Sequence, residues 1–277
     1  MPELPEVETV RRGLENLAVG WKISTARNQH PRLLKQSSVA PLASITGARI
    51  LEAKRRGKFL WLVLNRPEVL VAHLGMSGQF LFHEADKPRA KHARATFQLA
   101  KGLRKRELIF NDQRTFGWLS IEECIDGIPT SAQHIALDPF EAAFDIESVV
   151  EKIRKRKVSI KTALLNQEIM SGVGNIYADE SLWRAKVHPE SEASSMSAAR
   201  IRRVIESAIE VMAEAIKQGG TSFDDMYINV NGESGFFEQS LNAYGLEGEP
   251  CVRCGTSIRR IAFANRSSHF CPKCQRK

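Results

Sequence analysis

The sequence predicts an α+β protein with an N-terminal helix, an antiparallel β-sandwich, a helical segment and a C-terminal zinc ribbon. Short apolar runs between about residues 46 and 121 follow one another without intervening helices, which is typical of antiparallel sheets. Beyond about residue 139, apolar residues recur with helical periodicity. Two cysteine pairs near the end of the chain then indicate a small ribbon held by a metal.

The first predicted element is an amphipathic helix from residue 3 to about residue 18. Its apolar residues Val7, Val10, Leu14 and Leu17 recur at helical spacing. Gly20 follows at a position suited to ending the helix.

Strands come next, and a linker separates them from the helices. The clearest β-rich runs cover 59–64, 69–72, 95–99, 107–110 and 118–121. A polar stretch marked by prolines, from Pro129 to about Pro139, is the best linker candidate. Helices are predicted at 146–155, 159–165, 175–183 and 197–217.

Composition and charge narrow the class of partner. The chain has 277 residues with 40 Lys and Arg against 32 Asp and Glu, a net charge of +8 that favours nucleic acid first and an anionic membrane second. No apolar run reaches the roughly 18 residues of a membrane span. The N-terminus lacks the basic and apolar regions of a secretory signal, so we expect a cytoplasmic protein without a membrane anchor.

Four of the five cysteines form the strongest local motif. Cys251 and Cys254 make one Cys-x2-Cys pair, and Cys271 and Cys274 make another, which together suit a tetrahedral zinc site. The cations between and beside these pairs make the ribbon suited to backbone phosphates: Arg259, Arg260, Arg266, His269 and Lys273. Cys124 stands alone, and we expect a buried structural thiol.

The N-terminus is the second motif. Removal of Met1 would expose Pro2 as a secondary amine, and an α-amino group has a pKa of about 7.7 to 8.0, well below that of lysine. Such an amine is a nucleophile that can form an iminium with a sugar carbon. Glu3 is adjacent and Glu6 lies one turn further. These residues alone are better explained as a helix start, in which proline pre-sets the backbone and the acids interact favourably with the helix dipole.

A third set of residues lies in glycine-bracketed turns. Met76 and Phe116 are candidates for wedges between base pairs, and Arg114 is a candidate cationic probe. Without further context, Met and Phe in such turns more often cap a core. The turn at 172–174 is too short for a dinucleotide fingerprint, but it opens the helix at Asn175, whose N-terminus can hold a phosphate.

Together these segments resemble the formamidopyrimidine-DNA glycosylase family, whose members excise oxidised purines and cleave abasic DNA. The similar segments occur in the same order over essentially the whole chain: residues 1–10, Arg56 to Lys58, 73–78, 172–180 and the cysteine ribbon. The resemblance implies a helix on a two-layer β-sandwich, a helical domain with a helix-two-turn-helix motif, and a zinc ribbon. We expect domains at 1–130, 146–248 and 249–277, with a linker at 131–145.

The resemblance also implies roles for individual residues. Pro2 would be the nucleophile, Glu3 the residue that handles protons at the deoxyribose, Glu6 a supporting carboxylate and Lys58 a cation at the lesion phosphate. The expected DNA-binding residues are His73, Met76, His92, Arg114, Phe116, Asn175 and Arg266. Gly220, Thr221 and Ser222 would begin a loop over the extruded base, and the four cysteines would hold one zinc ion.

The expected activity is excision of 8-oxoguanine and formamidopyrimidines from double-stranded DNA, followed by β,δ-elimination at the abasic site through a Pro2 Schiff base. We expect a monomer. Two alternatives are an endonuclease VIII-type glycosylase for oxidised pyrimidines and a non-catalytic zinc protein that binds DNA. Three positions differ from the family pattern, namely Arg94, Thr115 and Leu246, and the last two each remove a cation.

Overall fold

The computed structural model describes residues 2–84, 90–220 and 237–277 of the chain. These residues form two compact units. The first contains residues up to His134 together with the short stretch that begins at Gly219, and the second contains Ile135–Gln218 and Phe237–Lys277. The predicted division into three domains and a linker stays a prediction.

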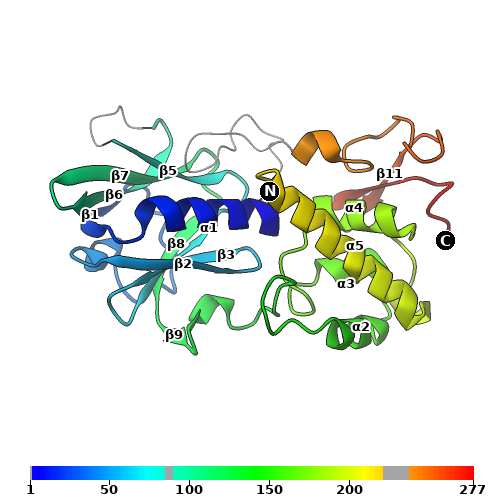
Figure 1. Cartoon of the computed structure of the whole chain (residues 1–277), viewed down its shortest axis with the longest axis horizontal. Coiled ribbons are helices and arrows are strands. Elements are labelled where there is room, and N and C mark those ends of the chain that lie inside the picture. The colour runs from blue at the N-terminus through cyan, green and yellow to red at the C-terminus, as the bar shows by residue number, and fades with distance from the viewer. Residues whose placement is uncertain (1, 85–89, 221–236) are drawn as a thin grey trace. The chain divides into compact units, whose positions relative to one another are not determined.

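The first unit begins with helix α1 (Leu4–Ala18). Helix α1 lies alongside β2 and β5, which are edge strands of two different sheets (Figure 1). Its apolar face enters the core through Val7, Val10 and Leu14, whereas Leu17 is only partly buried. The predicted amphipathic helix is therefore confirmed, and it covers the side of the sandwich between those two edges.

Two four-stranded antiparallel sheets form the sandwich. One sheet has the order β1-β6-β7-β5 and the other β2-β3-β4-β8. The strands of the first sheet are β1 (Lys22–Asn28), β5 (Gly78–Glu84), β6 (Ala93–Lys101) and β7 (Arg104–Asp112). The strands of the second are β2 (Ile50–Arg56), β3 (Phe59–Leu64), β4 (Val69–His73) and β8 (Trp118–Glu122).

Short elements complete the first unit. They are the 3-10 helices η1 (Leu42–Ile45) and η2 (Thr130–Ala132) and a small hairpin of β9 (Cys124–Ile125) and β10 (Ile128–Pro129). Cys124 is only half-buried in this hairpin, so the expectation of a buried thiol is wrong. The reason is its position on a two-residue strand beside exposed Ile125 rather than in a sheet that is covered on both faces.

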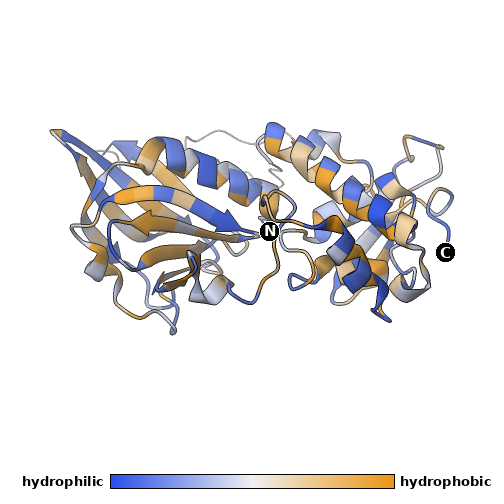
Figure 2. Ribbon diagram, turned by 60° about the horizontal axis from the view of Figure 1, so that its bottom comes forward, coloured by the Kyte–Doolittle hydropathy of each residue, from blue (hydrophilic) through white to orange (hydrophobic). Residues whose placement is uncertain are grey.

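Three strands of the sandwich lie outside the clearest runs that the sequence predicts, namely β1, β2 and β5. Each of them is an edge strand of its sheet. An edge strand tolerates polar side chains, which explains the weak apolar signal of β1 and β2. In β5 the apolar residues are confined to 80–82 and are flanked by polar residues and glycine. Figure 2 shows hydrophobic residues in the strands of the first unit, and the core contains residues of inner and edge strands alike, for example Leu60 of β3, Ile23 of β1 and Ile50 of β2.

The second unit begins with helices that confirm the predicted segments closely. They are α2 (Ile146–Arg154), α3 (Ile160–Leu165), α4 (Asn175–Ala185) and α5 (Ala198–Lys217), with η3 (Ala193–Ser195) and η4 (Phe237–Ser240) as short 3-10 turns. Side chains of Asp145, Ser159 and Ser197 cap α2, α3 and α5 by accepting backbone N–H groups. The predicted apolar face of α5 is buried along its length.

The chain ends in a two-stranded ribbon of β11 (Arg259–Phe263) and β12 (Arg266–Phe270). Ala264 and Asn265 have φ values of 42° and 61° and form the tight turn between these strands. The predicted α+β fold class is confirmed. None of the helices in the described parts of the chain combines the length and apolarity that a bilayer crossing needs.

Candidate functional site

The start of α1 holds two buried carboxylates directly after Pro2. Pro2 is buried, and Glu3 and Glu6 are each only 2% exposed. The Glu6 carboxylate accepts a hydrogen bond of 2.8 Å from the backbone N–H of Glu3, and the Glu3 side chain accepts the backbone N–H of Glu6. This reciprocal capping box fixes the first turn of the helix. The explanation of these residues as a helix start is therefore confirmed, whereas the nucleophile role of Pro2 stays a prediction.

Gly220 lies against this helix start. Its φ is +83°, and a Cβ atom at this position would come within 3.0 Å of Glu6 Oε1. A larger residue would therefore be strained and would press on the carboxylate. The first residue of the expected lesion loop is thus next to Glu6, while Thr221 and Ser222 lie outside the described residues.

Lys58 and His73 occupy neighbouring strand ends in one sheet. Lys58 is in the turn between β2 and β3, and Phe59 pairs with His73 of β4. Burial and, to a lesser extent, the charges of Lys58 and Lys35 together lower the pKa of His73 to about 4. His73 is therefore neutral at pH 7, and its Nδ1 accepts the Gly75 N–H at 3.1 Å. At this pH, His73 can contribute a hydrogen bond to DNA but no positive charge.

Met76, Arg114 and Phe116 lie on two turns that are brought together by the sheet. The side chains of Met76 and Phe116 are 40% and 53% exposed. The Arg114 guanidinium lies 4.9 Å from the centre of the Phe116 ring. The structure therefore does not bury the two wedge candidates in the core.

His92 and the family differences at Arg94 and Thr115 lie beside the same turns. The carbonyl of His92 accepts the backbone N–H of Asp112 at 2.9 Å, and the Arg94 guanidinium donates to the Asp112 carbonyl at 2.8 Å. Thr115 has a φ of 55°. Arg94 therefore makes a hydrogen bond within the protein, to the backbone of the strand that leads to Arg114.

Asn175 and Arg266 come from two elements that meet in the second unit. Before α4, the Gln167 side chain donates to Val173 O and accepts from Gly172 N, both at 2.9 Å, and so holds the turn that ends at Asn175. Asn175 Nδ2 donates to Ser267 O of β12 at 3.1 Å. Arg266, the residue before Ser267, is exposed. The helix N-terminus and the ribbon cation are therefore neighbours, as a shared phosphate site requires.

The sequence analysis missed an ion pair beneath this pair of residues. Lys161 of α3 and Asp179 of α4 are both fully buried, with Nζ and Oδ1 only 2.6 Å apart. Lys161 Nζ also donates to Ser267 O at 3.0 Å, and Asp179 accepts from Ser268 Oγ and His269 N, each at 2.8 Å. These contacts anchor β12 to the two helices. The sequence did contain a signal for this ion pair, namely a Lys within an apolar helix segment. Lysine is almost never fully buried unless it is paired, so a Lys at such a position predicts a buried acidic partner.

A second missed residue is Asp112, at the end of β7. It is fully buried and accepts hydrogen bonds from both turns that carry the wedge candidates. The signal in the sequence was an acid at the end of an apolar strand, directly before a turn.

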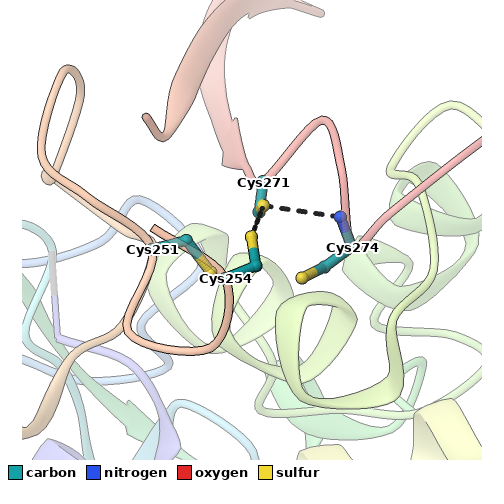
Figure 3. Close-up of side chains that lie close together, drawn as sticks. All are labelled: Cys251, Cys254, Cys271 and Cys274. Carbon is teal, nitrogen blue, oxygen red and sulfur yellow. Dashed lines mark hydrogen bonds between the residues drawn. The ribbon is translucent and has the colours of Figure 1, made fainter. Parts of the chain in front are cut away.

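The four predicted cysteines converge at the base of the ribbon (Figure 3). Their sulfur atoms all lie within 4.8 Å of one another, and those of Cys254 and Cys271 are 3.4 Å apart. Zinc–sulfur bonds of 2.3 Å in a tetrahedron place sulfurs about 3.8 Å apart, so the arrangement fits the ion. Four thiolates without a carboxylate or an open position form a closed, structural site for one zinc ion.

Comparisons with known proteins agree with this geometry. Three family models match in succession: "Formamidopyrimidine-DNA glycosylase N-terminal domain" over residues 1–119, "Formamidopyrimidine-DNA glycosylase H2TH domain" over 135–226, and "Zinc finger found in FPG and IleRS" over 248–276. A formamidopyrimidine-DNA glycosylase of Corynebacterium glutamicum is 50% identical over 100% of both chains. The chain belongs to the formamidopyrimidine-DNA glycosylase family.

Solved structures of this family have the same fold. Lactococcus lactis Fpg in complex with DNA containing an abasic site is 38% identical and has a TM-score of 0.87, covering 99% of this chain and 100% of that one. A variant of the same Lactococcus protein, in complex with DNA containing Fapy-dG, is 37% identical with a TM-score of 0.87 and covers 100% of both chains. The family resemblance predicted from the sequence is confirmed.

Proposed function

We propose that this chain is a base-excision DNA glycosylase that removes oxidised purines from double-stranded DNA and then cleaves the resulting abasic site. The observation that carries this proposal is the buried Glu3 and Glu6 pair behind Pro2, in a chain that matches formamidopyrimidine-DNA glycosylases over its whole length. The Fapy-dG and abasic-site ligands of the Lactococcus structures support the purine substrate and the abasic intermediate.

The first chemical steps take place at the N-terminus. With Met1 removed, the Pro2 nitrogen attacks C1′ of the damaged nucleotide, and the base leaves with the electrons of the glycosidic bond and gains a proton. The attached nitrogen loses its proton, and its lone pair then forms the iminium double bond to C1′ as the C1′–O4′ bond breaks and O4′ takes up a proton. Glu3 is the carboxylate adjacent to this nitrogen in sequence and moves protons at the deoxyribose, while Glu6 holds the helix start.

The iminium makes the following strand cleavage possible. Its positive nitrogen accepts electrons as a proton leaves C2′ and the bond to the 3′ phosphate breaks, and a second elimination releases the 5′ phosphate. Lys58 binds the phosphate of the lesion nucleotide, and Asn175 and Arg266 bind further phosphates. These contacts position the sugar and carry no sequence information.

Met76, Arg114 and Phe116 fill the gap in the duplex when the damaged nucleotide is flipped out. Filling the gap offsets part of the unstacking cost of a few kcal/mol. The exposed side chains of Met76 and Phe116 support this role, because each leaves apolar surface in water until DNA covers it. His73 and His92 lie beside these groups as neutral and half-buried partners, respectively.

We also propose that the protein acts as a monomer in the cytoplasm. Both statements rest on the resemblance to the formamidopyrimidine-DNA glycosylase family.

The experiment that tests the function is borohydride trapping with intact mass analysis of the purified protein. The two substrates are a duplex with 8-oxoguanine opposite cytosine and a matched duplex with dihydrouracil. We expect a covalent adduct that maps to Pro2 and is stronger on 8-oxoguanine. Stronger trapping on dihydrouracil would favour the endonuclease VIII-type alternative, and binding without an adduct in protein that lacks Met1 would favour the non-catalytic one.

Two proline variants sharpen this test. Pro2→Gly replaces the secondary amine and loosens the chain end, so trapping should fall about a hundredfold while DNA binding persists, since misplacing a reacting group by 1 Å can cost that much. Pro5→Ala is the matched control, because Pro5 lies in the first turn of the same helix but has no amine to offer. Full lyase activity in Pro2→Gly would contradict the assignment.

A further inference from the structure

Asp112 is a buried carboxylate between the two turns that carry Met76 and Phe116. It ends β7 and pairs in register with Gly78, the first residue of β5. The turn at 74–77 precedes β5 and the turn at 113–117 follows β7, so the sheet places both turns at the same end. Asp112 is fully buried beneath them.

Each oxygen of this carboxylate accepts hydrogen bonds from the turns. Oδ1 accepts from Ser77 Oγ at 2.6 Å and from the backbone N–H of Arg114 at 3.2 Å. Oδ2 accepts from the backbone N–H of Gly117 at 2.7 Å. Ser77 Oγ is shared as well, since it also accepts from Arg114 N at 3.2 Å. One side chain therefore joins the turn of Met76 to both ends of the segment that carries Arg114 and Phe116.

The two turns touch through their backbones. Gly75 has a φ of +60°, and a Cβ atom there would lie 2.4 Å from the Phe116 backbone carbon. No side chain fits between the turns at this point, so their separation depends on the backbone contact and on the hydrogen bonds to Asp112.

The side chains of Met76 and Phe116 are 40% and 53% exposed. The Arg114 guanidinium lies 4.9 Å from the centre of the Phe116 ring. Within the described residues, the hydrogen bonds to Asp112 join the two turns that carry these side chains.

We propose that Asp112 is a positioning residue for the glycosylase reaction: it holds the two wedge-bearing turns at the spacing that inserts Met76 and Phe116 into the gap left by the extruded base. This role rests on the function proposed above. Extrusion of an intact lesion requires unstacking a base, whereas an abasic nucleotide has no base to unstack. Loss of the wedge position should therefore slow base excision more than cleavage of a preformed abasic site.

Asp112→Asn is the direct test. An amide has one accepting oxygen and one donating nitrogen, so either Ser77 or Gly117 would face a donor in place of an acceptor. We expect the single-turnover rate of 8-oxoguanine excision to fall about tenfold or more, because a buried hydrogen bond to a charged group is lost. Cleavage of a preformed abasic duplex should change by less than about threefold under the same conditions.

Glu107→Gln is the matched control on the same strand. Glu107 is 3% exposed and its Oε1 accepts from Gln98 Nε2 at 2.6 Å, a contact that glutamine can keep. This variant should leave both rates unchanged. The fluorescence of 2-aminopurine beside the lesion gives a second measure, because wedge insertion unstacks the neighbouring base. We expect the rise seen with wild type to be reduced in Asp112→Asn and retained in Glu107→Gln.

Ser77→Ala gives an independent test if Asp112→Asn does not fold. It removes the shared hydroxyl and should lower excision selectively, by a smaller factor. Equal losses of excision and abasic cleavage in these variants, or no loss, would overturn the role of Asp112 while leaving the proposed function intact. A wild-type protein that acts on neither duplex would overturn the proposed function and this role with it.

Discussion

Glu8 joins helix α1 to the strand that leads to Lys58. Its carboxylate accepts hydrogen bonds from Arg11 Nε at 3.0 Å, Arg12 Nε at 2.8 Å and Arg55 Nε at 2.8 Å. Burial alone would raise the pKa of Glu8, but these bonds and the guanidinium charges lower it to about 2. Because Arg55 belongs to β2, this cluster fixes the helix that begins after Pro2 relative to the Lys58 turn.

Glu8→Gln should therefore lower the free energy of unfolding. The substitution removes the charged carboxylate that the nearly buried Arg55 guanidinium contacts at 2.8 Å, and breaking a buried pair of this kind costs roughly 3 kcal/mol. The pKa of Glu8 is lowered on folding, so its contribution is present above pH 4.5 and disappears as the pH falls toward about 2. Denaturant unfolding of wild type and variant across this range measures the difference.

Glu52→Gln is the comparison for this variant. Glu52 pairs with Lys54 at 3.1 Å on the same strand as Arg55, but both side chains are largely exposed, so its loss should cost less than about 1 kcal/mol. Equal effects of the two substitutions would show that the Glu8 cluster is no stronger than a surface pair.

The zinc ribbon is held at two points. The four cysteines lie at its base, where Trp183 of α4 packs against Cys251 and Cys271. Asp179 of α4 binds β12 through Ser268 and His269. The apolar cluster around the ribbon is small, so a metal rather than a hydrophobic core must supply most of its folding energy.

Removal of zinc should unfold the ribbon and lower DNA affinity while the helices remain. Amide hydrogen exchange of residues 249–277 should rise, and Trp183 fluorescence should change because the Arg253 guanidinium lies 3.7 Å from its ring. Cys271→Ser should reduce bound zinc, whereas Cys124→Ser lies outside the cluster and should keep one ion per chain. Unchanged DNA binding in protein that metal analysis shows to be free of zinc would refute the role of the ribbon.

The whole molecule carries a net charge of +8, and the cations proposed to bind phosphate come from several elements. We expect the logarithm of the DNA affinity to fall with the logarithm of salt concentration with a slope of about −5 or steeper, because several counterions are released. Fluorescence anisotropy with a non-cleavable abasic duplex measures this slope. A slope near zero would exclude phosphate contacts as the source of affinity.

Two arginine variants test which cations contribute to the salt dependence of DNA binding. Arg266→Ala should make the slope shallower by about 1 if Arg266 binds a phosphate. Arg184→Ala is the control, because the Arg184 guanidinium is bound to Glu214 at 2.7 Å and Glu210 at 3.4 Å and does not need DNA as a partner.

The sequence by itself determined the helices, the inner strands and the zinc ligands. Helices such as α5 have a 3.6-residue apolar period, and the two Cys-x2-Cys pairs have a spacing that zinc requires, so both signals are local. The catalytic and DNA-binding roles of individual residues were predicted from the family resemblance. The edge strands β1 and β2 gave no such signal, because their polar side chains reflect exposure at the edge of a sheet.

Only the tertiary structure decided how the strands pair and what the buried acids do. The order β1-β6-β7-β5 joins residues far apart in the chain, and no local pattern specifies it. Asp112 and Asp179 are fully buried, whereas an isolated sequence places aspartate on the surface. Their burial is tolerated because donors from distant segments surround each carboxylate, and those donors meet only in the folded chain.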